Sequence, residues 1–229
     1  MGNQTWKTIS YLFHPVLMPT LGLFIVIVSD PYIYLTIDIS QLLPSIAIVF
    51  LCTAVFPLLI SLVLLKMGGI SSLTNPTDND RKQLIAFSAL FFMLAYYVFH
   101  NIPPYGKSIS YFMLGVNIAM VVTLIANLFT KVSLHAVGIG GILGTVIGLM
   151  YYTRLLLLPQ VFSAIVLVCL VGLARYKLKA HATADIYIGN IIGVACQALV
   201  FIIASMAQFS FFKYTVLMGG KGMTMPSSL

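Results

Sequence analysis

The sequence predicts an all-α membrane protein, a polytopic bundle of six or seven transmembrane helices in a single domain. Hydrophobic residues make up 60% of the 229-residue chain and charged residues only 7%, whereas soluble domains carry about 25% charged residues. The apolar residues fall into long stretches, and about 20 apolar residues suffice for a helix to cross a bilayer. Short polar interruptions separate these stretches and leave no room for a large soluble domain.

The apolar stretches place seven expected spans along the chain. They cover about 16–35, 42–65, 84–99, 109–129, 136–152, 155–173 and 186–212. The first span is interrupted near its end by Ser29, Asp30 and Pro31. We expect the core of the bundle over about 66–212 and a flexible tail over about 213–229, where glycine and serine recur.

Three polar interruptions are expected to lie on one face of the membrane. They contain Arg81, His135 and His181. Two expected spans separate each interruption from the next, and an even number of crossings returns the chain to the same side. Residues far apart in the sequence are therefore predicted to share one membrane face.

Two of the spans carry glycine at every fourth position, which places the glycines on one face of each helix. The glycines are Gly140, Gly144 and Gly148 in the fifth span, and Gly189 and Gly193 in the last. Lipid gives no hydrophobic drive for helix association, so small residues that let backbones approach closely mark packing faces. We expect these two helices to pack together and to bring His135 near His181.

The third interruption carries residues suited to phosphate chemistry. Ionisable residues at the end of a membrane helix are functional candidates. His181 and Asp185 are four residues apart, so they share a helix face. The carboxylate can accept a hydrogen bond from one ring nitrogen and leave the other free to attack or to take a proton. Arg175 offers a planar guanidinium that suits phosphate oxygens.

The other two interruptions add cations, a hydroxyl and a second imidazole. Lys131, Ser133 and His135 come just before the fifth span, where a helix start can bind an anion. The earlier loop contributes Arg81 and Lys82. Such a set can neutralise a phosphate, let one histidine attack phosphorus and let the other protonate the leaving oxygen.

At this point the chain resembles the type 2 phosphatidic acid phosphatases, the PAP2 superfamily. The pattern Arg175-x5-His181-x3-Asp185 matches the third signature of that family. The stretch "VSLH" at 132–135 is similar to the second signature, Pro-Ser-Gly-His, with leucine in place of glycine. The two signatures are separated by two spans, as in the family. The resemblance covers roughly residues 80–195.

The first signature of the family, Lys-x6-Arg-Pro, is only partly present. Arg81 takes the place of its arginine, but Thr74 stands where the lysine is expected and Lys82 where the proline is expected. The missing lysine weakens the ground-state binding that the resemblance implies. Lys131 and Lys82 are the candidates to compensate for it.

The resemblance implies a metal-independent phosphatase without a cofactor, on a PAP2-like helical core. It implies that His181 forms a phosphohistidine, that Asp185 orients His181, and that His135 protonates the leaving alcohol or phosphate. The implied ligands of the phosphate oxygens are Arg175, Ser133 and Arg81, with Lys131 and Lys82 as further candidates. The implied substrate is a lipid phosphomonoester or diphosphate, such as phosphatidate, phosphatidylglycerol phosphate, a polyprenyl diphosphate or a lipid A phosphate.

Two alternatives stay open beside the phosphatase. One is a catalytically inactive PAP2-like protein that binds anions or acts as a small transporter. The other is a metal-dependent hydrolase in which His135, His181 and Asp185 hold zinc, although the cations Arg175 and Lys131 disfavour a bound metal ion. Beside these functional readings stands a structural one, because basic residues at helix ends often extend into the headgroup region.

Other ionisable residues are expected to have interfacial roles. Lys177 and Lys179 are interpreted as interfacial anchors or headgroup contacts. His14 and His100 lie at the ends of expected spans without matching partners, so we expect interfacial histidines there.

The net charge of +7 suits anionic lipids or an anionic substrate and gives no basic patch typical of nucleic-acid binding. The expected partners are therefore the lipid phosphate substrate and membrane lipids. The face with the three interruptions holds more basic residues than the other, and the positive-inside rule would place it in the cytoplasm. The resemblance instead implies a site on the periplasmic face of a bacterial inner membrane, and we take that as the expectation.

Overall fold

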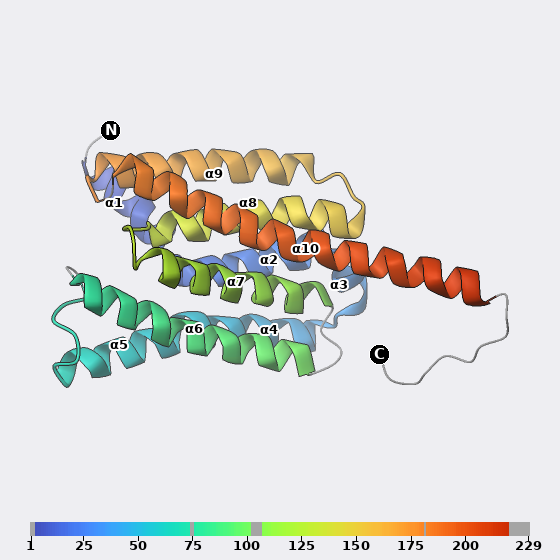
Figure 1. Cartoon of the computed structure of the whole chain (residues 1–229), viewed down its shortest axis with the longest axis horizontal. Helices are drawn as coiled ribbons and strands as arrows, with labels where there is room; N and C mark the ends of the chain where they lie inside the picture. Colours follow the sequence, from blue (N-terminus) through green and yellow to red (C-terminus); the bar gives the residue numbers. More distant parts are fainter. Residues whose placement is uncertain (1–2, 74–75, 102–106, 181, 220–229) are drawn as a thin grey trace.

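The computed structural model describes residues 3–73, 76–101, 107–180 and 182–219 of the chain. These residues form helices joined by short loops, with no strand among them (Figure 1). In chain order the elements are α1 (Asn3–Leu12), η1 (Pro15–Leu17), α2 (Met18–Ser29), α3 (Pro31–Thr36), α4 (Ile39–Phe50), η2 (Leu51–Val55), α5 (Phe56–Lys66), α6 (Asp78–Asn101), α7 (Lys107–Ala126), α8 (Leu134–Thr153), α9 (Leu158–Lys177) and α10 (Thr183–Gly219).

Within the described ranges, seven helical segments are long and apolar enough to cross a membrane, which confirms the all-α membrane bundle. The chain is thus an integral, multi-pass membrane protein. The segments are Gln4–Ser29, Ser40–Lys66, Asp78–Asn101, Lys107–Ala126, Leu134–Thr153, Leu158–Lys177 and Thr183–Ser210.

The first span begins earlier than the expected start near residue 16. The additional N-terminal part of this span is helix α1, which packs against α9. The N-terminal stretch is too polar to be recognised by apolar length, because Lys7 and several polar residues interrupt it. Pro15 then begins the short 3₁₀-helix η1, whose N-cap is His14.

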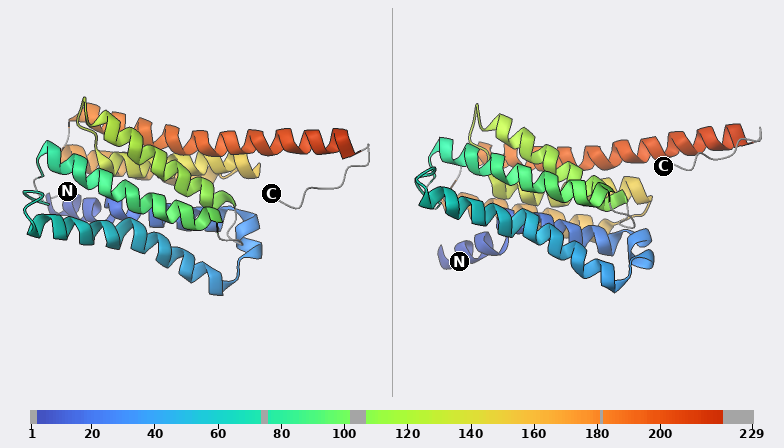
Figure 2. Two further views of the ribbon diagram at one scale, coloured as in Figure 1. Left: turned by 60° about the horizontal axis from the view of Figure 1, so that its bottom comes forward. Right: turned by 90° about the horizontal axis from the view of Figure 1, so that it is seen from below.

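The last helix ends later than expected. Helix α10 continues to Gly219 instead of ending near Phe212. The flexibility of the tail over about 213–229 stays a prediction. The chain has no proline or glycine between Phe212 and Gly219, and paired glycines at Gly219 and Gly220 are the first strong helix breakers there. The C-terminal part of α10 projects beyond the other helices (Figures 1 and 2). The rest of the expected tail, 220–229, lies outside the described residues.

The second span contains a π-helix in its middle. Element η2 lies between α4 and α5, with Pro44 inside α4 and Pro57 at the start of α5. A proline lacks the N–H that a regular α-helix would use, and single π-turns within helices occur often at functional sites. Thr53 of this turn is fully buried, and it lines the cavity described below.

Helices α8 and α10 pack backbone against backbone, as the glycine spacing predicts. A Cβ atom added to Gly140 would lie 2.6 Å from the carbonyl oxygen of Asn190, and one added to Gly189 would lie 2.7 Å from the carbonyl oxygen of Ser133. Gly144 lies in the same way against the backbone of Val194. Only glycine permits this approach, so α8 becomes the most buried span of the bundle.

The helices around this pair form two groups. Helices α2, α7, α9 and α10 contact α8, while α4, η2, α5 and α6 pack together beside them. The start of α6, the α7–α8 loop and the α9–α10 turn lie at the same end of the bundle (Figures 1 and 2). The prediction that the three polar interruptions share one face is therefore confirmed for the residues that the structure describes.

Candidate functional site

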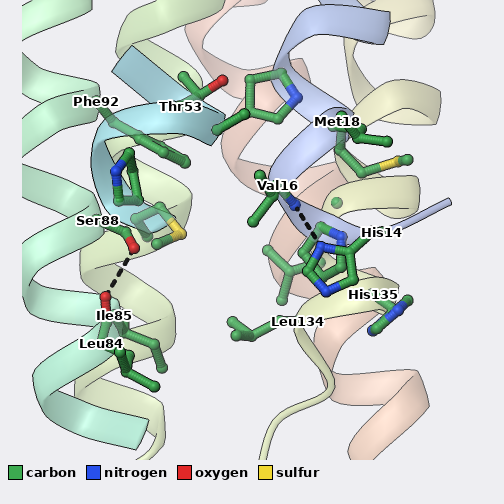
Figure 3. A pocket seen from close by; sticks show the side chains of 18 of the residues that line it. His14, Val16, Met18, Thr53, Leu84, Ile85, Ser88, Phe92, Leu134 and His135 are labelled. Atoms are coloured by element: carbon green, nitrogen blue, oxygen red, sulfur yellow. Dashed lines mark hydrogen bonds between the residues drawn. The ribbon is translucent and has the colours of Figure 1, made fainter. Parts of the chain in front are cut away.

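A cavity of about 1150 Å³ lies between parts of the two groups of helices. Its walls come from η1 and α2, from η2 and α5, and from α6, α7 and α8 (Figure 3). Most of the lining is apolar, with Phe92, Phe112, Val116 and Ile142 among the side chains. The cavity therefore offers a large apolar volume within the membrane-spanning part of the protein.

Cationic and imidazole side chains line this cavity as well. They belong to residues from the first, third, fifth and sixth spans and the turn after the sixth: His14, Arg81, His135, Arg175 and Lys179. No aspartate or glutamate is among the described residues that line the cavity. The described lining thus combines apolar walls with cationic side chains and includes no acidic side chain.

One serine joins the arginine of α9 to the histidine of α8. Arg175 donates a hydrogen bond from Nη1 to Oγ of Ser10 over 2.9 Å. The same Oγ lies 3.2 Å from Nε2 of His135, and that nitrogen lies 3.1 Å from the carbonyl oxygen of Ser10. A carbonyl oxygen can only accept, so the Nε2 atom of His135 carries a hydrogen in this contact. The Nε atom of Arg175 is buried without a hydrogen-bond partner among the described residues.

The chain turns sharply at the end of α9, so that Lys179 reaches the cavity. The N–H of Ala180 donates to the carbonyl of Arg175 over 3.2 Å, and the N–H of Lys179 donates to the carbonyl of Tyr176 over 3.0 Å. These two bonds form a Schellman motif, which needs a left-handed residue, usually glycine. Here that residue is Lys179, with φ of 52°. Lys179, expected as an interfacial anchor or headgroup contact, lines the cavity.

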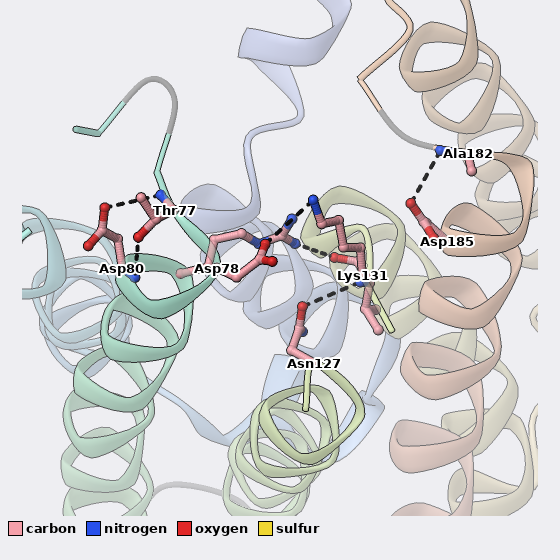
Figure 4. A network of polar contacts seen from close by, with 9 residues as sticks. Thr77, Asp78, Asp80, Asn127, Lys131, Ala182 and Asp185 are labelled. Carbon is pink, nitrogen blue, oxygen red and sulfur yellow. Dashed lines mark hydrogen bonds and ion pairs between the residues drawn. The ribbon is translucent and has the colours of Figure 1, made fainter. Parts of the chain in front are cut away.

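The position of Arg81 follows from the capped start of α6. Asp80 accepts a hydrogen bond from the N–H of Thr77 over 3.0 Å, and its own N–H donates to the Thr77 hydroxyl over 3.2 Å, as in a capping box (Figure 4). Asp80 also accepts from the N–H of Ser71 over 3.2 Å. Arg81 follows directly, and its Nη2 donates to the carbonyl of Val132 over 2.6 Å.

Ser133 and Asp185 meet through their backbones. The N–H of Ser133 donates to the carbonyl of Asp185 over 3.2 Å, which joins the start of α8 to the start of α10. The Ser133 hydroxyl is buried without a hydrogen-bond partner among the described residues, and it does not line the cavity. The Asp185 carboxylate accepts from the N–H of Ala182 over 3.2 Å (Figure 4). The expected side-chain contact of Ser133 with a phosphate therefore stays a prediction.

The expected nucleophile, His181, lies outside the described residues. Its neighbours on the N-terminal side, Lys179 and Ala180, both line the cavity. The expected pairing of His181 with Asp185 and its approach to His135 stay predictions.

Lys82 and Lys131 are placed beside the cavity instead of in its lining. Both line a smaller hollow of about 250 Å³, to which Arg81 also contributes. The ammonium of Lys131 lies 3.5 Å from the carboxylate of Asp78, and both side chains are exposed (Figure 4). An exposed pair of this kind is weak. That Lys82 and Lys131 compensate for the missing signature lysine also stays a prediction.

Sequence reasoning missed two residues at the site, Ser10 and His14. His14 lines the cavity, and its ring centroid lies 5.5 Å from that of His135 (Figure 3). Ser10 is separated by 125 residues from His135 and by 165 from Arg175. No local pattern in the sequence marks such contacts. The only available signal is that His14 precedes Pro15, which ends the first helix and exposes a histidine at the turn.

Comparison with protein-family models, curated proteins and solved structures finds no match to this chain. The PAP2 resemblance therefore rests on the signature residues alone. In the part of the chain that the structure describes, no three His, Cys, Asp or Glu side chains are grouped as metal ligands. The zinc alternative includes His181, which lies outside that part, so it is not tested.

Proposed function

We propose that this protein hydrolyses the phosphomonoester or diphosphate of a membrane lipid, through a phosphohistidine on His181. The observation that carries the proposal is one continuous cavity lined by apolar side chains together with Arg81, Arg175 and Lys179. Apolar walls suit a lipid tail, and cations suit its phosphate. A soluble phosphate ester would need only the cations.

The size of the cavity supports a lipid substrate. Pockets for drug-sized ligands measure about 300–1000 Å³, and this cavity measures about 1150 Å³. Its apolar walls are formed by membrane-spanning helices, and its lining includes Gln197, which lies well inside α10. In this arrangement the tail lies between α5, α6 and α7, and the phosphate lies beside Arg81 and Arg175.

The proposed reaction has two steps. A ring nitrogen of His181 attacks phosphorus, the phosphorus–oxygen bond to the leaving group breaks, and the leaving oxygen keeps the electron pair and takes a proton. The resemblance implies His135 as the proton donor. Water then attacks phosphorus and gives a proton back to His135, while the phosphorus–nitrogen bond breaks and its electron pair returns to the ring of His181. Arg81 and Arg175 stabilise the charge on the phosphoryl oxygens in both steps.

Asp185 and Ser133 have supporting roles in this proposal. Asp185 orients the His181 ring through a hydrogen bond and so leaves the other nitrogen free for attack. Ser133 begins α8 with a backbone contact to Asp185, which holds the two halves of the site together. The site is proposed to face the periplasm of a bacterial inner membrane, and neither a metal nor a cofactor takes part.

Phosphate release from lipid phosphates tests the proposal. Purified protein in detergent, with a chelator present, is offered phosphatidate, phosphatidylglycerol phosphate, a polyprenyl diphosphate and a lipid A phosphate, with glycerol phosphate as the soluble comparison. We expect release from at least one lipid, inhibition by vanadate, slow release from glycerol phosphate, and no release by His181→Ala.

Other outcomes would favour the alternatives. Orthophosphate binding without release from any of these lipids would overturn the phosphatase and support an anion-binding protein or transporter. Activity that the chelator abolishes and zinc restores would support the metal-dependent hydrolase.

A further inference from the structure

We propose that the N-terminal segment completes the phosphate site, with His14 binding a phosphoryl oxygen and Ser10 positioning Arg175 and His135. This inference rests on the proposed function for its substrate. It adds a segment outside the 80–195 stretch of the resemblance, and in this segment His14 was expected to be only an interfacial histidine.

The local sequence holds His14 in an extended turn at the cavity. Helix α1 ends at Leu12, and Pro15 begins η1. His14 is the N-cap of η1, with φ of −66° and ψ of 138°. Its ring meets the ring of His135 at an interplanar angle of 77°, so one ring edge faces the other ring (Figure 3). The fold therefore brings two imidazoles to the same wall of the cavity.

The hydrogen bond that His14 accepts determines which of its ring nitrogens can donate a hydrogen bond to a ligand. The N–H of Val16 donates to Nδ1 of His14 over 3.4 Å. Because Nδ1 is the acceptor, the neutral ring carries its hydrogen on Nε2. This N–H is a donor that suits a phosphoryl oxygen, and the ring lines the cavity together with Arg81, Arg175, Lys179 and His135.

Ser10 fixes the same segment to the rest of the site. It is buried, with 8% of its surface exposed. Its Oγ accepts the hydrogen bond of Arg175 and contacts His135. A single residue of α1 thus holds a phosphate-binding cation and the implied proton donor. Since threonine stands at position 74 in place of the signature lysine, His14 supplies a donor that the resemblance lacks.

Binding of orthophosphate to the purified full-length protein, measured by calorimetry beside lipid-phosphate kinetics, tests the inference. We expect His14→Ala to weaken orthophosphate binding and to raise KM by about tenfold, as for the loss of one hydrogen bond to a charged group, with little change in kcat. His14→Gln keeps an N–H donor and should recover part of the binding. His100→Ala is the matched control, because His100 ends α6 at the opposite end of the bundle, where it packs on Tyr96. It should behave as the wild type.

Three results would overturn the role of His14. The first is wild-type binding and KM in His14→Ala. The second is an equal loss in both His14 variants with a lowered unfolding temperature, which would indicate a structural role. The third is a defect in His14→Ala that disappears with an aryl phosphate, because an easy leaving group rescues the loss of a proton donor and leaves a binding defect unchanged.

The same measurements separate this inference from the proposed function. Wild-type protein that binds orthophosphate but releases none from lipids would end the proposed function, and the His14 variants would still decide the binding role. If the wild type hydrolyses a lipid phosphate and His14→Ala has the same rate of release and the same KM, only the inference about His14 is overturned. Wild-type protein that neither binds orthophosphate nor releases phosphate from any of the lipids would end both.

Discussion

The Nη1 atom of Arg175 lies 2.9 Å from the hydroxyl oxygen of Ser10, and this contact fixes the end of α9 to the N-terminal helix. The pairing places a residue of the sixth span against a residue of the first. Because Ser10 also contacts His135, a substitution in α1 should affect the site even though the signature residues themselves are unchanged.

Ser10→Ala should lower kcat/KM for a lipid phosphate by about tenfold, since hydrogen bonds to charged groups contribute about 1.5–3 kcal/mol. Helix α1 should stay folded, because its other contacts with α9 are unchanged. Ser163→Ala is the matched control, because Ser163 is exposed on α9 and its hydroxyl donates only within its own helix, to Pro159 over 2.8 Å. Steady-state kinetics on both variants decide the question. Equal rates for the two variants would contradict a positioning role for Ser10.

Gly144→Ala should destabilise the bundle, because the added Cβ atom would enter the backbone of Val194. Overpacking of this kind costs about 1–3 kcal/mol. Gly172→Ala is the comparison, since its added Cβ atom would meet only Ile186, at 3.6 Å. Thermal unfolding in detergent should show a lower midpoint for the first variant and an unchanged or higher midpoint for the second. The opposite order would argue against close packing of α8 and α10.

Lys179→Gly should separate stability from phosphate binding. The left-handed backbone of Lys179 costs a residue with a side chain about 1–2 kcal/mol, so glycine should raise the unfolding temperature. Loss of a cation from the cavity should raise KM. Lys177→Ala, which changes an exposed residue outside the cavity lining, should leave KM unchanged. A Lys179→Gly protein with both stability and KM at wild-type values would show that neither effect exists.

Ser88→Phe should alter which lipids the protein accepts. Ser88 lines the cavity on α6, one turn from Phe92 (Figure 3). A phenyl ring there fills volume that we assign to the lipid tail. Phosphate release from long-chain lipids should fall relative to short-chain analogues, while Ser163→Phe on the exposed face of α9 should leave the ratio unchanged. If the ratio of long-chain to short-chain phosphate release is unchanged in Ser88→Phe, the lipid tail does not occupy this part of the cavity.

Much of the fold could be predicted from apolar length and glycine spacing. These patterns are local, and they identify the spans, the shared face of the polar interruptions and the α8–α10 contact. They fail at α1, because its polar residues interrupt the apolar stretch. They also fail at Ser10 and His14, whose partners are distant in sequence. The burial of Ser133 could not be foreseen either, since the depth of a side chain at a helix start depends on the helix packed against it.

Loss of Arg175 is the sharpest test of the proposal that the cationic side chains of the cavity hold the phosphate of a lipid for hydrolysis. The measurement is the rate of phosphate release from the preferred lipid by Arg175→Gln, beside Arg154→Gln at the opposite end of the bundle. Removing one donor to the reacting phosphoryl group should slow release by about 10²–10³-fold, while Arg154→Gln should match the wild type. Equal rates for both variants and the wild type would contradict the account.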